Sequence, residues 1–366
     1  MELSNKEFST YSKEDVIFLL KDISDVSLEQ NNEEREKAIQ GGRHYSEMLP
    51  IEYQVSNVYL NLYKEKLEVY KEKLAYCVGV MAEKMLKEKG EKIVLVSLAR
   101  AGTPIGILAK RYIYKRYNLN LPHYTISIIR DKGIDENAIK YILKNHKDMK
   151  IQFIDGWTGK GTICKVLETA CETLLTKYNI TLDANLAVLA DPAGYSNAFG
   201  VREDFLIPSA CLNSTVSGLV SRTVLRDDLI QKNDFHGAKY YKELKGFDES
   251  NDYLDKISKE FENVYDEIDK YMKCWTKDEI TKLGYEDVTN IIKDLDVKDI
   301  NYIKPGIGET TRVLLRRIPN KILVKDLNDS ELEHIFVLAR EKNIPIEEYR
   351  LKAYKCCGII KDMKDV

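Results

Sequence analysis

The sequence predicts an α/β protein: a doubly wound parallel sheet, preceded by a helical N-terminal extension and followed by a small α/β domain. Two observations predict this class. Apolar, β-branched runs of strand length alternate with segments of helical periodicity in the middle of the chain. The stretch NYIKPGIGE, typical of a linker, then leads into a shorter alternation of the same kind. We therefore expect two α/β units of unequal size.

The length and composition favour a soluble protein with more than one unit. The chain has 366 residues, of which 44% are hydrophobic and 31% are charged, and its formal net charge is −3. This length exceeds what one hydrophobic core usually serves. The small net charge excludes a globally basic nucleic-acid-binding protein but is compatible with a local basic patch. Because no apolar run has the character of a signal segment or a membrane span, we expect a cytoplasmic protein without membrane association.

Seven cysteines are scattered along the chain without C-x-x-C spacing. Such an odd and dispersed set predicts neither a disulfide framework nor a zinc site. We expect most of the cysteines to be reduced residues of the core, as buried free cysteine usually is.

Residues 1–90 are predicted to form the helical extension. Ser12 and Asp15 precede the apolar run VIFLL in a pattern similar to a capping box, which predicts a short helix there. From about residue 55 to 88, aliphatic and aromatic residues recur at helical spacing between lysines and glutamates. This pattern predicts one long or broken amphipathic helix.

Residues 91–250 are predicted to form the central domain. Near-continuous apolar strands are typical of parallel sheets that are covered on both faces. Residues 191–245 lack clear periodicity and predict an irregular insertion, a kind of segment that often carries function. The expected strands are 93–98, 123–129, 151–155 and 186–190, with helices at 135–145 and 160–178.

The stretch IQFIDGWTGKGT ends a predicted strand and opens a predicted helix. In an open parallel sheet, ligands bind beyond the carboxyl ends of the strands, where loop amides and helix N-termini attract anions. A glycine-rich turn lets backbone N–H groups approach one phosphate, and threonine hydroxyls add donors. Asp155, at the end of the strand, is placed to accept from ribose hydroxyls or to support a hydrated magnesium ion. The pattern of a P-loop, GxxxxGK[ST], is absent from the sequence.

This arrangement resembles the phosphoribosyl-diphosphate-binding loop of type I phosphoribosyltransferases. The resemblance implies a sheet of phosphoribosyltransferase type, a turn that cradles a 5′-phosphate, and an Asp155 that faces the ribose and holds Mg²⁺ indirectly. Gly156 stands where these enzymes usually carry a second acid, and Trp157 is unusual there. The implied substrate-binding residues are Gly156, Thr158, Gly159, Lys160, Gly161 and Thr162.

Two further loops follow predicted strands in the order that the resemblance requires. In SLARAGTPIG, Arg100 would offer a bidentate cation to the diphosphate, while Ala101 and Gly102 let backbone amides approach. In IIRDKGID, Arg130 and Lys132 are the candidate cations for stabilising the departing diphosphate. The implied reaction moves a phosphoribosyl group from phosphoribosyl diphosphate to a small acceptor, with magnesium. An α/β domain that keeps this fold but binds another phosphate, or none, stays an alternative.

From about residue 10 to 250 the chain is similar to a narrower group, the phosphoribosyltransferase-like proteins of bacterial tellurium-resistance (Ter) stress operons, called StiP. Stretches that carry the similarity include REKAIQGGRHYSEMLP, REDFLIPSACLNSTVSGLVSRTV and DFHGAKYY. The resemblance implies a part in making a nucleoside-like metabolite, whereas the StiP name is attached to a cysteine protease. We keep two interpretations of Cys211: a structural residue beside a substrate pocket, or the nucleophile of a cysteine peptidase.

Polar residues in apolar surroundings mark the irregular segment, and buried polar groups need partners. They predict either a pocket for the acceptor, with Cys211 beside it, or a structural network of hydrogen bonds and ion pairs. The residues concerned are Arg202, Asp204, Ser217, Arg222, Asp234 and His236.

Residues 251–300 are predicted to be a helical connector, and residues 301–366 resemble a Pelota-type RNA-binding domain. A basic cluster in this last unit could meet RNA phosphates, although the unit is only slightly positive and has no interleaved aromatic residues for base stacking. Non-catalytic RNA binding or nucleotide sensing is therefore a third interpretation, and a homo-oligomer stays open. The cluster consists of Arg312, Arg316, Arg317, Lys321 and Lys325.

Overall fold

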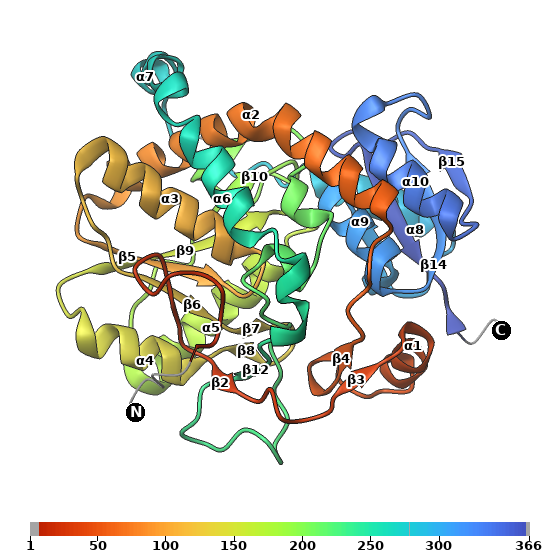
Figure 1. Cartoon of the computed structure of the whole chain (residues 1–366), viewed down its shortest axis with the longest axis horizontal. Coiled ribbons are helices and arrows are strands. Elements are labelled where there is room, and N and C mark those ends of the chain that lie inside the picture. The colour runs from red at the N-terminus through yellow and green to blue at the C-terminus, as the bar shows by residue number, and fades with distance from the viewer. Residues whose placement is uncertain (1–6, 278, 364–366) are drawn as a thin grey trace.

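A six-stranded sheet with all strands parallel forms the centre of the protein in a computed structural model that describes residues 7–277 and 279–363 (Figure 1). The inner strands are buried along almost their whole length, which explains their near-continuous apolar sequences. The predicted strands are confirmed, but the run at 123–129 is interrupted at Ser127. In order across the sheet the strands are β1 (Ile17–Phe18), β6 (His123–Ile126), β5 (Ile93–Leu98), β9 (Lys150–Trp157), β10 (Leu186–Ala190) and β11 (Phe199–Val201).

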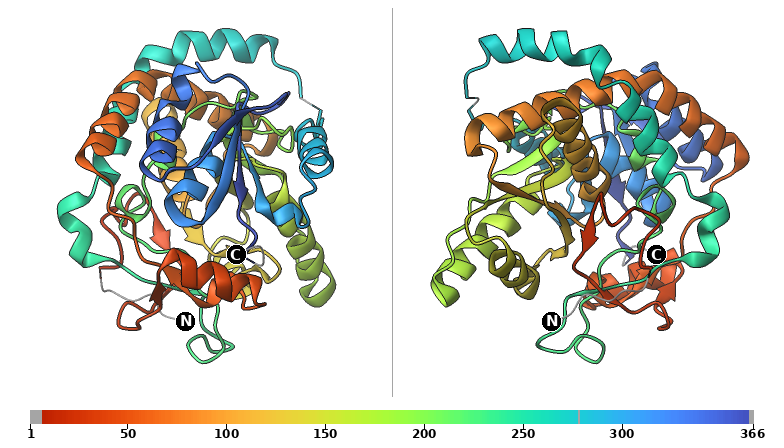
Figure 2. Two further views of the ribbon diagram at one scale, coloured as in Figure 1. Left: turned by 90° about the vertical axis from the view of Figure 1, so that its right-hand side faces the viewer. Right: turned by 60° about the vertical axis from the view of Figure 1, so that its left-hand side comes forward.

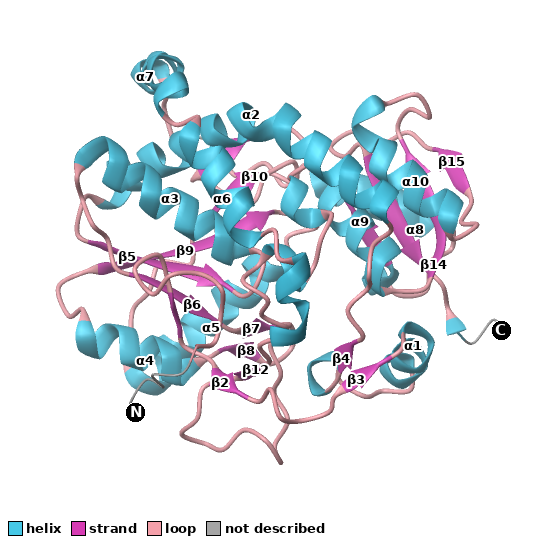
Figure 3. Cartoon of the chain, viewed as in Figure 1, coloured by secondary structure: helices cyan, strands magenta, loops and turns pink. Residues whose placement is uncertain are grey.

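Helices cover both faces of this sheet (Figure 3). Alternate side chains of one strand enter the two layers: Leu95 lies with the first pair of helices, and Val94 and Val96 lie with the second. The predicted α/β architecture with a covered parallel sheet is therefore confirmed, and its phosphoribosyltransferase type stays a prediction. The first pair is α2 (Asn57–Lys89) and α3 (Gly102–Tyr117), and the second is α4 (Glu136–Asn145) and α5 (Thr162–Tyr178).

The N-terminal segment differs from the predicted helical extension, of which residues 1–6 lie outside the described residues. The carbonyl of Ser12 closes a turn by accepting from the N–H groups of Asp15 and Val16, and the chain then forms β1 at the edge of the sheet. The predicted short helix is wrong, because so short an apolar run gains more by pairing with β6 than by forming one isolated helical turn. The long helix predicted at 55–88 is confirmed as the unbroken α2. The other elements here are β2 (Lys21–Asp22), β3 (Glu29–Gln30), α1 (Asn32–Gln40), η1 (Tyr45–Glu47) and β4 (Leu49–Pro50).

The segment 191–245, predicted to be an irregular insertion, contains only short regular elements among its described residues and is closely packed. Most residues between 204 and 224 are buried. One strand of the segment pairs with β2, so the insertion is joined to the N-terminal residues. Its regular elements are η2 (Pro208–Ala210), η3 (Ser214–Val216), β12 (Gly237–Ala238) and η4 (Lys242–Phe247); a separate antiparallel pair, β7 (Ile128–Ile129) and β8 (Gly133–Ile134), follows β6.

The predicted helical connector divides between the two units. Its first helices, α6 (Ser250–Lys259) and α7 (Tyr265–Cys274), pack on α2 and are separated by η5 (Glu262–Val264). The last helix, α8 (Gly284–Asp294), packs with the C-terminal sheet instead. Within residues 7–277 and 279–363, no helix combines the length and the apolar character needed to cross a membrane.

The C-terminal unit is a mixed four-stranded sheet with helices packed on it, and α2 runs along both units (Figure 1). Figure 2 shows α1 beneath this unit, where the Gln40 side chain donates to the Lys361 carbonyl at 3.0 Å. Distant parts of the sequence therefore enclose one volume. The strand order is β13 (Ile303–Pro305), β16 (Cys356–Ile360), β14 (Pro319–Val324) and β15 (Ile346–Glu348), with η6 (Ile300–Tyr302), α9 (Ile307–Arg316), η7 (Ser330–Leu332) and α10 (Glu333–Glu341).

Candidate functional site

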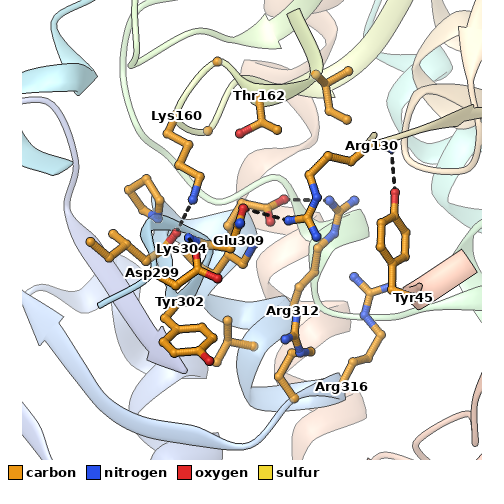
Figure 4. Close-up of a pocket in the computed structure, with 18 of the residues that line it drawn as sticks. Tyr45, Arg130, Lys160, Thr162, Asp299, Tyr302, Lys304, Glu309, Arg312 and Arg316 are labelled. Atoms are coloured by element: carbon orange, nitrogen blue, oxygen red, sulfur yellow. Dashed lines mark hydrogen bonds and ion pairs between the residues drawn. The ribbon is translucent and has the colours of Figure 1, made fainter. Parts of the chain in front are cut away.

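A cavity of about 870 Å³, here called the main cavity, lies between the central sheet and the C-terminal unit (Figure 4). Its wall is formed by α1, the turn between β9 and α5, residues 298–305, and α9. Nine lysines and arginines line it against four aspartates and glutamates, so the wall is strongly cationic. The nine cations are Arg35, Arg130, Lys160, Arg222, Lys298, Lys304, Arg312, Arg316 and Arg317.

The turn after β9 provides one wall of the main cavity. Gly161 has a φ of +79°, and a Cβ there would lie 2.4 Å from the Tyr195 ring, so only glycine suits this corner. The Thr158 N–H donates to the Ala190 carbonyl at 3.0 Å, and the Thr158 hydroxyl donates to the buried Asp191 carboxylate. The first turn of α5 follows and lines the cavity. The wall therefore combines a fixed turn with the N–H groups of a helix N-terminus, which attract anions.

Two cations of the C-terminal unit face the main cavity without a partner of opposite charge. Arg316 ends α9 and Lys304 lies on β13, and Figure 4 shows both at the wall. Within the described part of the chain, neither side chain forms a hydrogen bond or an ion pair. Burial, reinforced by neighbouring cations, lowers the pKa of Lys304 to about 7 and also lowers the pKa of Arg316. These are the groups that an anionic ligand would neutralise.

Two other arginines of the wall are fixed by carboxylates. Arg317 donates two hydrogen bonds to Glu36 of α1, at 2.6 and 2.8 Å. Arg312 donates to Glu309 on its own helix at 2.8 Å. Paired in this way, these guanidinium groups stay in place but keep little free charge.

Tyr45 contacts two further arginines of the cavity wall, Arg130 and Arg222. Its hydroxyl accepts the Arg130 N–H at 2.7 Å, and its carbonyl accepts from the Arg222 guanidinium at 3.0 Å. Its ring centroid lies 5.3 and 4.7 Å from the two guanidinium carbons. Burial lowers the pKa of Arg222 to about 9, and it lowers the pKa of Lys160, whose ammonium donates to the Ile303 carbonyl at 3.1 Å, to about 8.

Asp155 lies at the carboxyl end of β9, inside this cationic wall. Burial raises its pKa to about 6, an effect that the positive charge of Arg312 only partly offsets. Among the described residues, no group of three or more histidine, cysteine, aspartate or glutamate side chains is arranged to hold a metal ion. Since Glu309 is already paired with Arg312, the residues present do not form a complete protein site for magnesium. The indirect magnesium role of Asp155 stays a prediction.

The structure places most of the predicted catalytic and phosphate-binding residues, and two of the predicted acceptor-pocket residues, at two adjoining cavities. They divide between the main cavity and a second cavity of about 20 Å³, which shares Arg312 and Arg316 with it. The residues that line the main cavity are Arg130, Asp155, Thr158, Gly159, Lys160, Gly161, Thr162 and Arg222; those that line the second are Arg100, Ala101 and Ser217.

The predicted loop after β5 is occupied by internal contacts. Arg100 forms an ion pair with Glu52 at 3.3 Å and donates to the Asn213 side chain at 3.1 Å. A Cβ on Gly102 would lie 2.3 Å from the Ile154 carbonyl, so this glycine allows α3 to approach β9 closely. The loop therefore holds the central sheet to the irregular insertion.

Several predicted residues lie outside both cavities. Asp204 is buried and accepts the backbone N–H groups of Ile307 at 3.0 Å and Lys355 at 2.8 Å, which fixes the start of α9. Arg202 donates to the Asp191 carboxylate. These contacts favour the structural-network interpretation over an acceptor pocket. The predicted residues outside both cavities are Gly102, Lys132, which is exposed, Gly156, Arg202, Asp204, Cys211, Asp234 and His236.

The two predicted residues nearest the end of the insertion also have structural partners. Asp234 forms an ion pair with Lys21 at 2.5 Å. The Nδ1 atom of His236 lies 2.9 Å from the Ser127 hydroxyl, and the His236 backbone N–H donates to Asp135 at 2.6 Å. Both residues therefore tie the insertion to the N-terminal segment and to β7–β8.

The cysteines are mostly core residues, as predicted. Cys211 is 1% exposed, and burial raises its pKa to about 12. Cys164, in the first turn of α5, lines the main cavity, and burial raises its pKa to about 12 as well. No described histidine is hydrogen-bonded to either thiol. Both cysteines are thiols rather than reactive thiolates at neutral pH in this conformation.

The sequence does not single out many residues of the main cavity, among them Arg35, Tyr45, Tyr302 and Lys304. Arg35 belongs to a charged helix of ordinary composition, and Lys304 lies in a stretch typical of a linker. Tyr45 and Tyr302 stand in segments without clear periodicity. Their common property, a position on the wall, results from tertiary packing alone.

Comparison with known proteins gives two family matches and a relative. The family described as "Tellurite-like stress resistance cysteine protease StiP" matches residues 9–258, and the "PELOTA RNA binding domain" matches residues 282–362. A protein of Acinetobacter baylyi (strain ATCC 33305 / BD413 / ADP1), named "Cysteine protease StiP", is 32% identical over 348 residues, which cover 92% of this chain and 89% of that protein.

These matches contradict the predicted phosphoribosyl transfer. Because the family and the relative are both named as cysteine proteases, the transferase prediction is wrong, and neither match supports phosphoribosyl diphosphate or an acceptor as partners. The names support the alternative of a cysteine peptidase, and the resemblance to StiP and to a Pelota-type domain is confirmed. The chain belongs to the StiP family of stress-resistance proteins and carries a Pelota-type RNA-binding domain in its C-terminal part.

Proposed function

We propose that this StiP-family chain binds RNA, or a nucleotide derived from it, through phosphate groups that enter the main cavity. The observation that carries the proposal is the pair of unpartnered cations, Lys304 and Arg316, on the wall formed by the Pelota-type domain. Lysine and arginine bind nucleic acid chiefly through its phosphates. The match to an RNA-binding domain supports nucleic acid as the source of these phosphates.

The opposite wall supplies complementary donors. Figure 4 shows Lys160 and Thr162 facing the side on which Lys304 lies. The Thr162 hydroxyl and the first turn of α5 line the same volume. A hydroxyl, a helix N-terminus and two free cations are the groups that commonly surround a bound phosphate.

The proposal is tested by fluorescence anisotropy with a short single-stranded RNA that carries its label on an internal base. Arg316→Ala should weaken binding about tenfold or more and reduce the slope of affinity against salt by about one. The matched control is Arg340→Ala, because Arg340 is exposed on α10 outside the cavity. The Arg340→Ala variant should bind the RNA with an affinity within about twofold of that of the wild type. Equal affinities of the two variants, or a wild type that binds neither RNA nor nucleotides, would contradict the proposal.

A second candidate function is thiol-dependent peptide hydrolysis, which the names of the family and of the Acinetobacter relative favour. The described conformation keeps Cys211 in the apolar core and Cys164 on the cavity wall, each with a raised pKa. Hydrolysis by either thiol therefore requires a rearrangement that supplies a general base and stabilises the thiolate.

Casein hydrolysis by Cys164→Ala, Cys211→Ala and Cys274→Ala tests this second function. Cys274 is exposed and serves as the control. If the chain is a peptidase that uses one of these two buried thiols, one of the first two variants should lose activity while keeping its melting temperature. Activity retained by both variants would exclude these two thiols as the nucleophile.

A further inference from the structure

We infer that the main cavity recognises a terminal phosphate monoester, at the end of a single RNA strand or on a free nucleotide, in preference to internal or duplex RNA. This inference rests on the phosphate binding proposed above and specifies the part of the ligand that is bound. It follows from the positive charge of the wall, the size of the cavity, and an aromatic ring on the wall.

The Pelota-type domain places two unpartnered cations, Lys304 and Arg316, on the wall of the main cavity. On the outer surface, Lys321 pairs with Glu347 at 2.8 Å and Lys352 pairs with Glu286, whereas Lys325 and Arg340 are exposed. Inside the cavity a phosphate is screened from solvent, so a cation acts on it more strongly there than on the open surface. RNA that reaches Lys304 and Arg316 has to enter the cavity.

The second cavity adjoins the main cavity at Arg312 and Arg316, and its volume of about 20 Å³ is enough for little more than a water molecule. A nucleotide therefore does not extend into it. The main cavity itself has the size of a small-molecule site. A ligand of nucleotide size fits, whereas a duplex does not.

The positive charge of the wall favours a strand end. An internal phosphodiester carries one negative charge, whereas a phosphate monoester carries about 1.5 to 2 at neutral pH. Lys304 and Arg316 have no partner among the described residues. Other cations of the wall donate to carbonyl groups and have no carboxylate partner in the described part of the chain, so the cavity attracts the ligand of higher charge; these cations are Arg35, Lys160 and Arg222. Arg312 and Arg317 add little, because Glu309 and Glu36 already neutralise them.

Tyr302 provides a surface for a base next to this phosphate position. Its side chain is half-buried on the cavity wall, on the same side as Lys304 (Figure 4). In the described residues its ring takes part in no aromatic pair and no cation–π contact. An aromatic ring with a free face stacks on any base, so Tyr302 would retain a nucleotide better than phosphate alone.

The test compares versions of one short RNA sequence, labelled on an internal base: linear with a 5′-phosphate, linear with a 3′-phosphate, linear with hydroxyl ends, and circular. At least one phosphorylated linear form should bind about tenfold more tightly than the hydroxyl-ended and circular forms. AMP should compete with it, and Arg316→Ala should weaken both. If AMP binds and no RNA does, the terminal phosphate of a free nucleotide is the ligand and the inference holds.

Tyr302→Ala separates the role of the base from that of the phosphate. The Tyr302→Ala variant should bind AMP about fivefold or more weakly than the wild type and should bind inorganic phosphate with unchanged affinity. Tyr302→Phe should bind both ligands as the wild type does. If circular RNA binds as tightly as phosphorylated linear RNA and Arg316→Ala weakens both, RNA binding stands and recognition of the end is wrong. If the wild type binds no RNA and no nucleotide, the proposed function fails, and this inference fails with it.

Discussion

The guanidinium of Arg312 lies over the indole ring of Trp157, with its carbon 4.2 Å from the ring centroid. A Cβ added to Gly308, one turn earlier on α9, would lie 2.3 Å from the same indole. Trp157 therefore inserts between the end of β9 and α9 and joins the StiP region to the Pelota-type domain. This contact explains why so bulky a residue follows Gly156 at the edge of a ligand cavity.

Loss of the indole should loosen the contact between the two units. Trp157→Ala removes the packing on Gly308 and the cation–π contact, and because Trp157 is only half-buried we expect a loss of about 2–3 kcal/mol in the free energy of unfolding. Urea denaturation measures this loss, and Trp157→Phe should recover about half of it. If Trp157→Ala has the same free energy of unfolding as the wild type, the contact does not hold the two units together.

Asp204 should be essential for the position of α9. In Asp204→Ala the backbone N–H groups of Ile307 and Lys355 lose their acceptor, which should lower the free energy of unfolding by about 1–3 kcal/mol. The neighbouring Glu203 is the control, since it is exposed and forms ion pairs with Lys73 and Lys355 at the surface rather than accepting buried backbone N–H groups. Glu203→Ala should change stability by less than about 0.5 kcal/mol. Equal effects of the two variants in urea denaturation would refute the role of Asp204.

Asp191 should act on ligand binding through the turn after β9, without touching the ligand. This fully buried carboxylate accepts from the Thr158 hydroxyl, from the N–H groups of Tyr195 and Ser196 at 3.0 and 2.8 Å, and from Arg202. Asp191→Ala should lower the free energy of unfolding by about 2–4 kcal/mol and weaken AMP binding well below the melting temperature. Asp191→Asn keeps a side-chain acceptor, so it should lose less stability and less affinity for AMP than Asp191→Ala. Unchanged AMP affinity in a folded Asp191→Ala protein would show that the turn does not depend on this residue.

Ligand binding should weaken as the pH rises above neutrality. Lys304, which faces Lys160, Arg130, Arg317 and Glu309, has its pKa lowered from 10.5 to about 7, mainly by burial. A group with a depressed cationic pKa binds fewer protons in the folded state, so the free protein gains stability from Lys304 as the pH rises from about 7 towards 10. A bound phosphate favours the protonated lysine and reverses this preference. The stabilisation by AMP should therefore be larger at about pH 6.5 than at about pH 9.

Thermal unfolding with and without AMP at the two pH values measures this difference. Lys304→Met keeps the length of the side chain and should remove much of the pH dependence. Lys325→Met is the matched control, because Lys325 is exposed outside the cavity. An AMP effect that grows from pH 6.5 to 9 in the wild type would contradict the assignment of Lys304 to the phosphate.

The central fold and half of the cavity could be predicted because both depend on local sequence. The apolar composition of segments such as 93–98 and 186–190 predicts strands, and the glycines and threonines after β9 predict a turn. By contrast, β1 consists of Ile17 and Phe18 alone, too few residues to show an alternation. Its strand conformation depends on β6, which lies far along the chain.

The other half of the cavity could not be predicted, because it depends on contacts between distant residues. Arg35 donates to the carbonyl of Arg316, 281 positions further along the chain. The sequence around Lys304 has no distinctive pattern, and this side chain lines the cavity only because β13 packs where it does. The structural roles of Asp204 and Arg100 are hidden for the same reason, since their partners lie in other units.

The hydrogen bonds between α1 and the last described residues determine at which stage of synthesis the wall of the main cavity can form. The Gln40 side chain donates to the Lys361 carbonyl and accepts the Met363 N–H at 2.7 Å, so one wall of the cavity is anchored to residues that are synthesised after every strand of both sheets. The central sheet has its strands long before that point, and chains generally fold in the order of synthesis. A nascent chain that still lacks residues 361–363 therefore carries a formed central sheet but an incomplete cavity wall.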